Sequence, residues 1–247
     1  MSFDSEVQAE SAVAFEHGAA GLHAFESHPE ESPAPGREQI AVPASPYIPA
    51  KRVLDIVGAM VLAAVFSPLI LAIVVLMGRG RGSIIYKHRR VGKGGRTFEC
   101  LKFRTMVPNA DQFLRDLLER DPVIKAEWVR DHKLRCDPRV TRLGRFLRRT
   151  SLDELPQLWN VMRGEMSLVG PRPVVREELL RYGRNVRAYL SARPGITGLW
   201  QVKGRNDTDY RRRVVLDTYY VRNQNLLLDL YILLKTTRVV LGGSGAY

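Results

Sequence analysis

Two adjacent carboxylates, Asp153 and Glu154, are the side chains of this chain best suited to chemistry. They lie in the run Thr150-Ser-Leu-Asp-Glu-Leu-Pro-Gln-Leu158. The basic residues around this run are Arg142, Arg145, Arg148, Arg149 and the arginine of Gly170-Pro-Arg-Pro173. An ionised carboxylate can act as a nucleophile or bind a hard cation such as Mg²⁺. An acidic pair in a basic setting therefore suggests catalysis on an anionic substrate, with both carboxylates as candidate catalytic and metal-binding groups.

The same pair also has a purely structural interpretation. Ser151, followed three residues later by Glu154, matches a capping box that begins a helix. The apolar residues that would form one face of this helix are Leu155, Leu158, Trp159 and Met162. In the first turn of such a helix, Asp153 would be stabilised by the helix dipole and would stay ionised at neutral pH. The spacing alone is compatible with a cap and with a catalytic pair.

A long apolar segment precedes these motifs. Residues 56–77 carry no charge and are numerous enough to span a bilayer. The basic residues that flank the segment are Lys51, Arg52, Arg79 and Arg81. The positive-inside rule places both flanks on the cytoplasmic side, which one straight pass cannot satisfy. Pro68 breaks the hydrogen-bond ladder and the Ser67 hydroxyl can satisfy a freed carbonyl, so the alternatives are a kinked spanning helix and a re-entrant helix-break-helix.

A β-hairpin is predicted for the residues after this segment. Two β-rich runs, 83–91 and 96–104, flank Gly92-Lys-Gly-Gly95. The glycines join two strands and open no helix, which favours a turn over a phosphate-binding loop. Lys102 and Arg104 alternate with apolar residues, so both cations are expected on one face of the second strand.

Two further segments have helical patterns. Residues 109–120 are amphipathic, and residues 226–241 are more apolar but are interrupted by Asp229, Lys235 and Arg238. Each segment is either an ordinary core helix or a helix that lies in the plane of the lipid headgroups.

Arginines in restricted backbone settings are candidate phosphate contacts. The prolines on both sides of Arg172 limit its backbone, which pre-positions a guanidinium for bidentate phosphate binding. Arg193 and Arg205 lie in turn-like segments near Trp200. The indole of Trp200 is either a stacking surface for a nucleotide base or part of the core.

Charge is distributed unevenly along the chain. Residues 1–50 contain eight acids and one base, a net charge of −7, so the overall +12 leaves +19 for residues 51–247. This basic part favours nucleotide sugars, anionic lipids or nucleic acid as partners, although no nucleic-acid-binding motif is present. Residues 1–49 are rich in Ala, Glu, Ser and Pro and are predicted to be a disordered cytoplasmic tail. Two cysteines imply no disulfide framework.

Five motifs in a fixed order carry a resemblance to a known family. They are Lys102-Phe-Arg-Thr-Met106, Asp137-Pro-Arg-Val-Thr141, Ser151-Leu-Asp-Glu-Leu-Pro-Gln-Leu158, Gly164-Glu-Met-Ser-Leu-Val-Gly-Pro-Arg-Pro173 and Arg193-Pro-Gly-Ile-Thr-Gly-Leu-Trp-Gln-Val202. From about residue 51 onward the chain resembles the bacterial sugar transferases, the monotopic phosphoglycosyl transferases. It is most similar to the short enzymes that begin exopolysaccharide synthesis by moving galactose 1-phosphate onto undecaprenyl phosphate, and is expected to lack the spanning helices that larger relatives carry.

The resemblance implies a membrane-associated α/β fold. Residues 50–80 would form a re-entrant helix, and residues 81–247 a small cytoplasmic catalytic domain with a β-hairpin and amphipathic interfacial helices. The expected location is the cytoplasmic face of the bacterial inner membrane. The expected partners are membrane lipids, downstream glycosyltransferases and a second copy of the chain, without nucleic acid.

The resemblance also implies a reaction. A sugar 1-phosphate would pass from a UDP-sugar to undecaprenyl phosphate with release of UMP, through a phosphosugar intermediate on Asp153 and with the help of Mg²⁺. Glu154 would bind the metal or assist proton transfer. The residues that would bind substrate are Lys102, Arg104, Arg172, Arg193 and Arg205. The alternatives are a membrane-anchored scaffold and a basic nucleic-acid-binding protein without catalysis.

Overall fold

The structure is a computed structural model that describes residues 47–241, except 79, 81, 132–133, 135 and 205–208. The first half contains α2 (Tyr47–Gly78), β1 (Ile85–Val91), β2 (Thr97–Phe103), α3 (Ala110–Arg120), α4 (Pro122–Asp131), α5 (Arg142–Thr150) and α6 (Gln157–Arg163). The second half contains β3 (Ser167–Val169), α7 (Val186–Ser191), β4 (Gly195–Thr197), α8 (Leu199–Lys203), α9 (Tyr210–Asn223) and α10 (Leu226–Leu241). The short 3₁₀ turns are η1 (Lys93–Gly95), η2 (Leu152–Glu154) and η3 (Glu177–Asn185). The fold is mixed α/β, as predicted, but helices dominate it.

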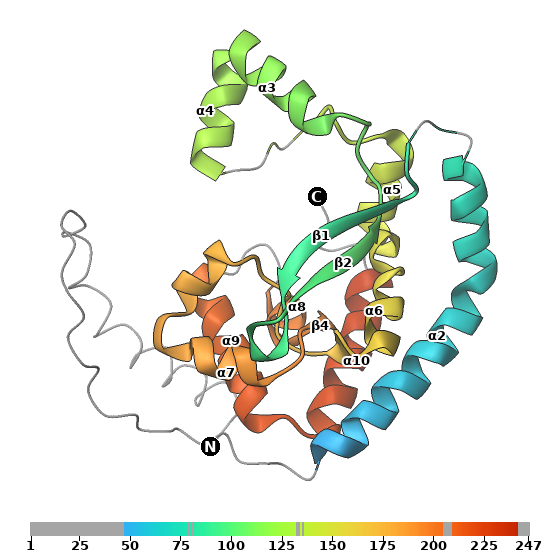
Figure 1. Cartoon of the computed structure of the whole chain (residues 1–247), viewed down its shortest axis with the longest axis vertical. Coiled ribbons are helices and arrows are strands. Elements are labelled where there is room, and N and C mark those ends of the chain that lie inside the picture. Colours follow the sequence, from blue (N-terminus) through green and yellow to red (C-terminus); the bar gives the residue numbers. More distant parts are fainter. Residues whose placement is uncertain are drawn as a thin grey trace, which may run out of the picture.

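Helix α2 is long and apolar enough to cross a membrane. It continues through Pro68, and Figure 1 shows its axis changing direction along its length. Proline removes the hydrogen bond to the carbonyl of Ala64, and the Ser67 hydroxyl donates to that same carbonyl at 2.7 Å. The predicted compensation at the Ser-Pro step is therefore present, while the re-entrant path through a bilayer stays a prediction. Two of the flanking arginines, at positions 79 and 81, lie outside the described residues.

The boundary between tail and helix differs slightly from the predicted one. The predicted tail ends at residue 49, whereas α2 already includes Tyr47–Pro49. A proline is tolerated in the first helical turn because its missing N–H has no partner within the helix. The rest of the predicted tail, residues 1–46, lies outside the described residues.

The predicted hairpin is confirmed. Strands β1 and β2 pair antiparallel from Ile85 opposite Phe103 to Val91 opposite Thr97. Gly94 has φ +69°, a conformation that favours glycine, which confirms the turn.

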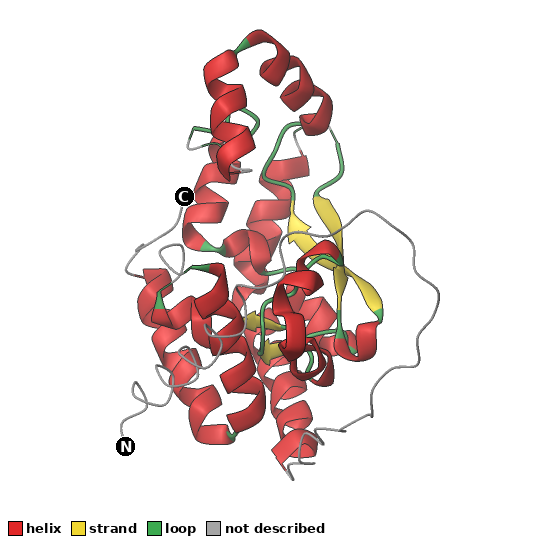
Figure 2. Ribbon diagram, turned by 90° about the vertical axis from the view of Figure 1, so that its left-hand side faces the viewer, coloured by secondary structure: helices red, strands yellow, loops and turns green. Residues whose placement is uncertain are grey.

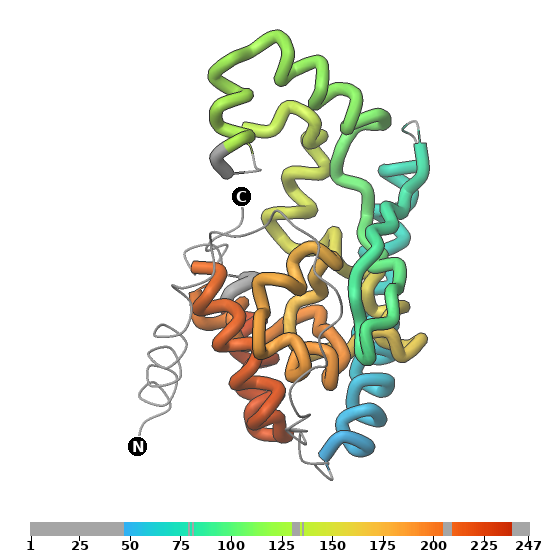
Figure 3. Tube along the Cα trace, turned by 60° about the vertical axis from the view of Figure 1, so that its left-hand side comes forward, coloured from blue at the N-terminus to red at the C-terminus, as the bar shows by residue number. Residues whose placement is uncertain are grey.

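Helices α6, α8, α9 and α10 pack around a small parallel sheet. Strands β3 and β4 pair in parallel, and the largest core cluster joins this sheet to α6, α8, α9 and α10. Helix α10 has the predicted bounds, with Ile232 buried and Leu227 and Leu234 exposed. By contrast, α3 buries none of its residues. It packs against α4, and the two project from one end of the molecule (Figures 2 and 3), so α3 is not a core helix.

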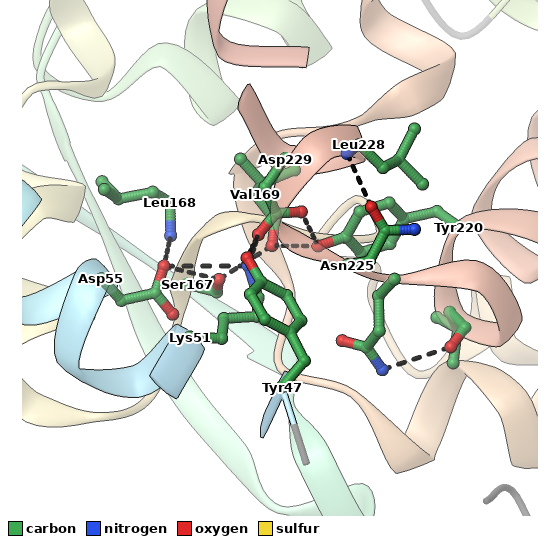
Figure 4. A network of polar contacts seen from close by, with 12 residues as sticks. Tyr47, Lys51, Asp55, Ser167, Leu168, Val169, Tyr220, Asn225, Leu228 and Asp229 are labelled. Carbon is green, nitrogen blue, oxygen red and sulfur yellow. Dashed lines mark hydrogen bonds and ion pairs between the residues drawn. The ribbon is translucent and has the colours of Figure 1, made fainter. Parts of the chain in front are cut away.

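A buried polar network ties the start of α2 to α10 (Figure 4). Lys51, expected as a basic flank at the membrane surface, is instead buried in an ion pair with Asp229 of α10. The hydroxyls of Tyr47 and Tyr220 donate to the two oxygens of Asp229, at 2.8 and 2.7 Å. A buried carboxylate needs such partners because it has lost its hydration. These contacts therefore hold the start of α2 against α10.

One turn further along α2, a second carboxylate holds the helix against β3. Asp55 is buried and accepts hydrogen bonds from the Ser167 hydroxyl and the Leu168 amide, both at 3.0 Å. The first two turns of α2 are thus fixed to α10 and β3, and most of the large apolar residues that α2 exposes lie beyond them.

Candidate active site

The acidic pair lies on η2, between α5 and α6. Asp153 is 9% exposed. The predicted capping box is wrong: Ser151 adopts the left-handed conformation with φ +56° and ends α5, and its side chain makes no capping bond. An N-cap residue needs an extended backbone instead. Helix α6 begins later, at Gln157, so the acidic pair is not part of a cap.

Lys102 of β2 reaches the pair from the hairpin. Its Nζ lies 2.6 Å from Oε1 of Glu154. Burial acts to lower the pKa of Lys102, but Glu154 and then Asp153 act in the opposite direction, and the pKa is raised overall. Lys102 therefore stays protonated and places a positive charge beside both carboxylates.

Asp153 is held in an environment that disfavours its charge. Burial raises its pKa to about 6, Lys102 opposes this shift, Glu154 adds to it and Arg148 again opposes it. The Nε of Arg148 donates to the Thr105 hydroxyl at 2.8 Å, which fixes this cation. Asp153 is mostly ionised at neutral pH, as predicted, but cations hold its charge instead of a helix dipole. A poorly solvated carboxylate of this kind is suited to act as a nucleophile.

A second basic cluster surrounds Trp200. The guanidinium carbons of Arg172 and Arg213 lie 5.5 and 4.2 Å from the centre of its ring. Trp200 is buried, so it belongs to the core, and no face is open for a stacked base. The Nε atoms of both arginines are buried without a hydrogen-bond partner among the described residues. Buried unpaired donors on cations are suited to an anionic ligand.

Arg90 of β1 extends this cluster toward the hairpin. Its Nη1 donates to the carbonyl of Pro173 at 3.3 Å, and its Nη2 lies 3.0 Å from Nδ1 of His88. Burial and the nearby charge of Arg172 lower the pKa of Arg90. Arg90 thus links the Pro-Arg-Pro segment to β1.

Cys100 lies between the acidic pair and the arginines. Burial raises the pKa of its thiol to about 11. The charges that also act on this thiol come from Lys102 and Glu154 on one side and Arg90 and Arg172 on the other. Along one face of the hairpin, Cys100 thus lies between Lys102, which contacts the acidic pair, and Arg90, which belongs to the arginine cluster.

The other predicted substrate contacts lie elsewhere. The Arg104 amide donates to Ile84 just beyond β2, and its guanidinium lies beside Gly82. The Nε of Arg193 donates to the Gly164 carbonyl at 2.8 Å, which satisfies the end of α6. Arg205 lies outside the described residues.

Two cations of the site, Arg90 and Arg213, were not singled out from the sequence, whereas Arg148 was named as part of the basic setting of the acidic pair. Arg90 could have been found, because it alternates with His88, which pairs with Cys100 two residues from Lys102. This register places Arg90, His88, Cys100 and Lys102 on one face of the hairpin. Arg148 and Arg213 reach the site only through the packing of α5 and α9.

The donor set fits Mg²⁺ bound together with a substrate. Among the described residues there is no group of three or more His, Cys, Asp and Glu side chains placed to hold a metal ion. Mg²⁺ usually takes one or two carboxylates, and substrate phosphates and waters fill its other positions. Asp153 and Glu154 meet that requirement.

Comparison with known proteins identifies the family. A sequence model described as "Bacterial sugar transferase" matches residues 47–243. This chain belongs to that family. The bacterial sugar transferases include larger proteins, and the chain spans about two-fifths of the length of the first curated relatives that it matches.

Three relatives illustrate the similarity. "UDP-galactose-lipid carrier transferase" of Erwinia amylovora is 54% identical over 80% of this chain and 41% of its own length. "Undecaprenyl-phosphate galactose phosphotransferase" of Salmonella typhimurium is 53% identical over 80% of this chain and 41% of its own length. "Exopolysaccharide production protein ExoY" of Rhizobium meliloti is 50% identical over 80% of this chain and 88% of its own length.

Proposed function

We propose that this bacterial sugar transferase moves a sugar 1-phosphate from a UDP-sugar to undecaprenyl phosphate, as the first membrane step of exopolysaccharide synthesis. The observation that carries the proposal is the buried Asp153 beside the Glu154–Lys102 pair, in a chain whose helix α2 is long and apolar enough to cross a membrane. The names of two relatives favour galactose as the sugar. The proposed location is the cytoplasmic face of the inner membrane.

The reaction would proceed in two steps at Asp153. A carboxylate oxygen attacks the β-phosphorus of the UDP-sugar, the bond to the bridging oxygen breaks, and UMP leaves with that electron pair. An oxygen of undecaprenyl phosphate then attacks the same phosphorus. The bond to Asp153 breaks, the carboxylate is regenerated, and undecaprenyl diphosphate sugar is formed.

The neighbouring side chains would offset the negative charges of the acidic pair and of the phosphates during both steps. Lys102 partly neutralises the acidic pair, which would otherwise repel a diphosphate. Arg172 and Arg213 would bind the nucleotide phosphate through Nε–H groups that have no partner among the described residues, and Arg90 would add a third positive charge beside them. Asp153 and Glu154 would hold Mg²⁺, which when bound would offset the charge of the diphosphate.

The site favours this function over the alternatives. A scaffold needs no buried carboxylate beside a lysine–glutamate ion pair, and the match to the sugar transferase family favours catalysis over nucleic-acid binding. Later glycosyltransferases would extend the lipid-linked sugar. The predicted homodimer stays a prediction.

The direct test is an assay of UMP release. The purified full chain, in detergent or lipid nanodiscs, would be incubated with undecaprenyl phosphate and a panel of UDP-sugars. We expect turnover with at least one UDP-hexose, led by UDP-galactose. Absence of UMP with every sugar in the panel would exclude the proposed function.

Lys102→Met is expected to change the pH dependence of the first step. Asp153 must be ionised to attack, so the rate falls as the pH drops through its pKa of about 6. Lys102 is the cation that lowers this pKa most. Its removal should therefore move the acid limb of the pH–rate profile, where the rate falls as Asp153 is protonated, to higher pH. The rate at pH 7 should fall by about tenfold.

Lys87→Met is the matched control. Lys87 lies on the same hairpin and pairs with Glu99 at 2.8 Å, but both side chains are exposed. Its loss should leave the acid limb unchanged, since exposed ion pairs contribute little. An unshifted limb in Lys102→Met would show that Lys102 does not set the pKa of Asp153.

Labelling should place both ends of α2 on the cytoplasmic side. Ala50→Cys and Gly80→Cys would be introduced after Cys136, an exposed thiol, is replaced by serine. A membrane-impermeant thiol reagent should reach both positions from the cytoplasmic face alone, because basic flanks resist translocation. Labelling of position 50 from the periplasm would contradict the re-entrant path. Pro68→Ala should straighten the helix and reduce activity.

A further inference from the structure

An apolar cavity opens between α2 and α10 beside the acidic pair. We propose that it binds the first isoprene units of the polyprenyl phosphate acceptor, with the phosphate head beside the Lys102–Glu154 ion pair. This inference rests on the proposed function and assigns the acceptor to a defined place in the fold.

The cavity has the size and lining of a ligand site. Its volume is about 540 Å³, within the range of about 300–1,000 Å³ typical of ligand pockets. The side chains that dominate its walls are Val61, Leu62 and Phe66 of α2, Leu158 of α6, Leu168 of β3 and Leu233 of α10. Thr197, Gln201 and Thr236 also line the cavity, but its walls are mostly apolar. A hydrocarbon chain is therefore a better fit than a sugar or nucleotide, most of whose polar groups would lack partners.

One end of the cavity is polar and belongs to the active site. Thr150, Ser151 and Glu154 line this end, and Glu154 is paired with Lys102. A ligand with an apolar chain and a phosphate head would therefore bring its phosphate to the acidic pair while its chain stays between the helices. This is the geometry that the second step of the proposed reaction needs.

The cavity follows from the way α2 is attached. The Lys51–Asp229 contact joins α2 and α10 at one point (Figure 4). The far half of α2 packs instead against Phe103 of the hairpin and Leu147 of α5. The two helices therefore diverge from a common base, as Figure 1 shows, and the cavity occupies the space between them.

A glycine lets α2 pack closely on β3 at one end of the cavity. Gly58 lines the cavity one turn beyond Asp55. A Cβ at this position would lie 2.7 Å from Cδ1 of Leu168. This end of the cavity is thus closed by direct packing of α2 on β3.

The bilayer is the natural source of the ligand. Val61 lines the cavity and is 56% exposed, and Val65, one turn further along α2, is 65% exposed. This apolar outer surface continues from the cavity wall along the helix that is suited to a membrane. A polyprenyl chain could therefore enter from the hydrocarbon region without crossing water.

The test compares Val61→Trp with Val65→Trp in the full chain. Both variants place the same large side chain on the same exposed helix, but only the first fills the cavity. Wild type and both variants should release UMP equally in the first step, without acceptor. Val61→Trp should raise the KM for undecaprenyl phosphate by at least about tenfold, whereas Val65→Trp should stay within about twofold of wild type.

A second variant and a cross-link make the outcome decisive. Thr237→Trp, from the exposed α10 side of the cavity, should reproduce the KM effect. A polyprenyl phosphate with a photoreactive group near its head should label the cavity-lining parts of α2 and α10, and undecaprenyl phosphate should displace it. Displacement by phosphatidylglycerol to the same extent would indicate a general lipid site and would overturn the proposal.

The kinetic outcomes separate the two hypotheses. If wild type releases UMP but Val61→Trp and Val65→Trp have the same KM for undecaprenyl phosphate, the proposed acceptor site is wrong and the proposed function still stands. Loss of the first step in Val61→Trp would also overturn the acceptor site. If wild type releases no UMP from any UDP-sugar, the proposed function itself fails.

Discussion

Asp153→Asn should abolish UMP release from the UDP-sugar, with or without undecaprenyl phosphate. A neutral amide is a poor nucleophile and a weaker metal ligand, so the rate should fall by at least about 10³-fold. Wild-type enzyme without acceptor should release no more UMP than there is enzyme. Mass spectrometry should then find one added hexose phosphate on the peptide that contains Asp153, and the variant should carry none.

The thermal stability of this variant separates lost chemistry from lost folding. The pKa of Asp153 is raised from 3.8 to about 6 in the folded chain, so its ionised form at pH 7 destabilises the fold. As the pH falls from about 6 to about 4, the folded chain is protonated at Asp153 before the unfolded chain is, so the penalty decreases progressively over this range. Asp153→Asn should therefore keep or raise the melting temperature. Asp111→Asn, at an exposed position of α3, is the control. It should change neither the rate of UMP release nor the melting temperature.

One result would reassign Asp153. If UMP release strictly requires undecaprenyl phosphate and no adduct can be trapped, the lipid phosphate attacks the UDP-sugar directly. Asp153 would then be a metal ligand and not a nucleophile.

Removal of divalent cations should stop turnover. Two carboxylates next to a diphosphate repel it, and the single charge of Lys102 cannot offset both. Excess EDTA should lower the rate by at least about 10²-fold, and Mg²⁺ in excess of the chelator should restore it. Undiminished turnover in EDTA would refute a metal requirement.

Glu154→Gln tests whether Glu154 binds the Mg²⁺ ion. The amide keeps the shape of the side chain but loses its charge, so the Mg²⁺ concentration needed for half-maximal rate should rise by at least about tenfold. Glu99→Gln is the matched control, since its carboxylate is exposed and pairs with Lys87. An unchanged Mg²⁺ dependence in Glu154→Gln would remove Glu154 from the metal site.

Features encoded by neighbouring residues could be predicted from the sequence alone. The hairpin, its glycine turn and the bounds of α10 all follow from alternation, helical period and turn chemistry. The hydrogen bond from Ser67 to Ala64 follows from the proline beside it. The ordered motifs also located the acidic pair and the family. Such signals are local, because each depends on residues only a few positions apart.

The tertiary structure decided what those residues contact. Ser151 ends α5, whereas the capping-box interpretation had it begin the following helix; the Ser-x-x-Glu spacing does not encode its left-handed backbone conformation. Lys51 is buried against Asp229, a partner 178 positions away, so a pattern of flanking charges could not predict it. Arg213 joins the site, and Arg193 satisfies α6 instead. The cavity beside Glu154 exists only because distant contacts hold α2 and α10 together at one end and apart at the other.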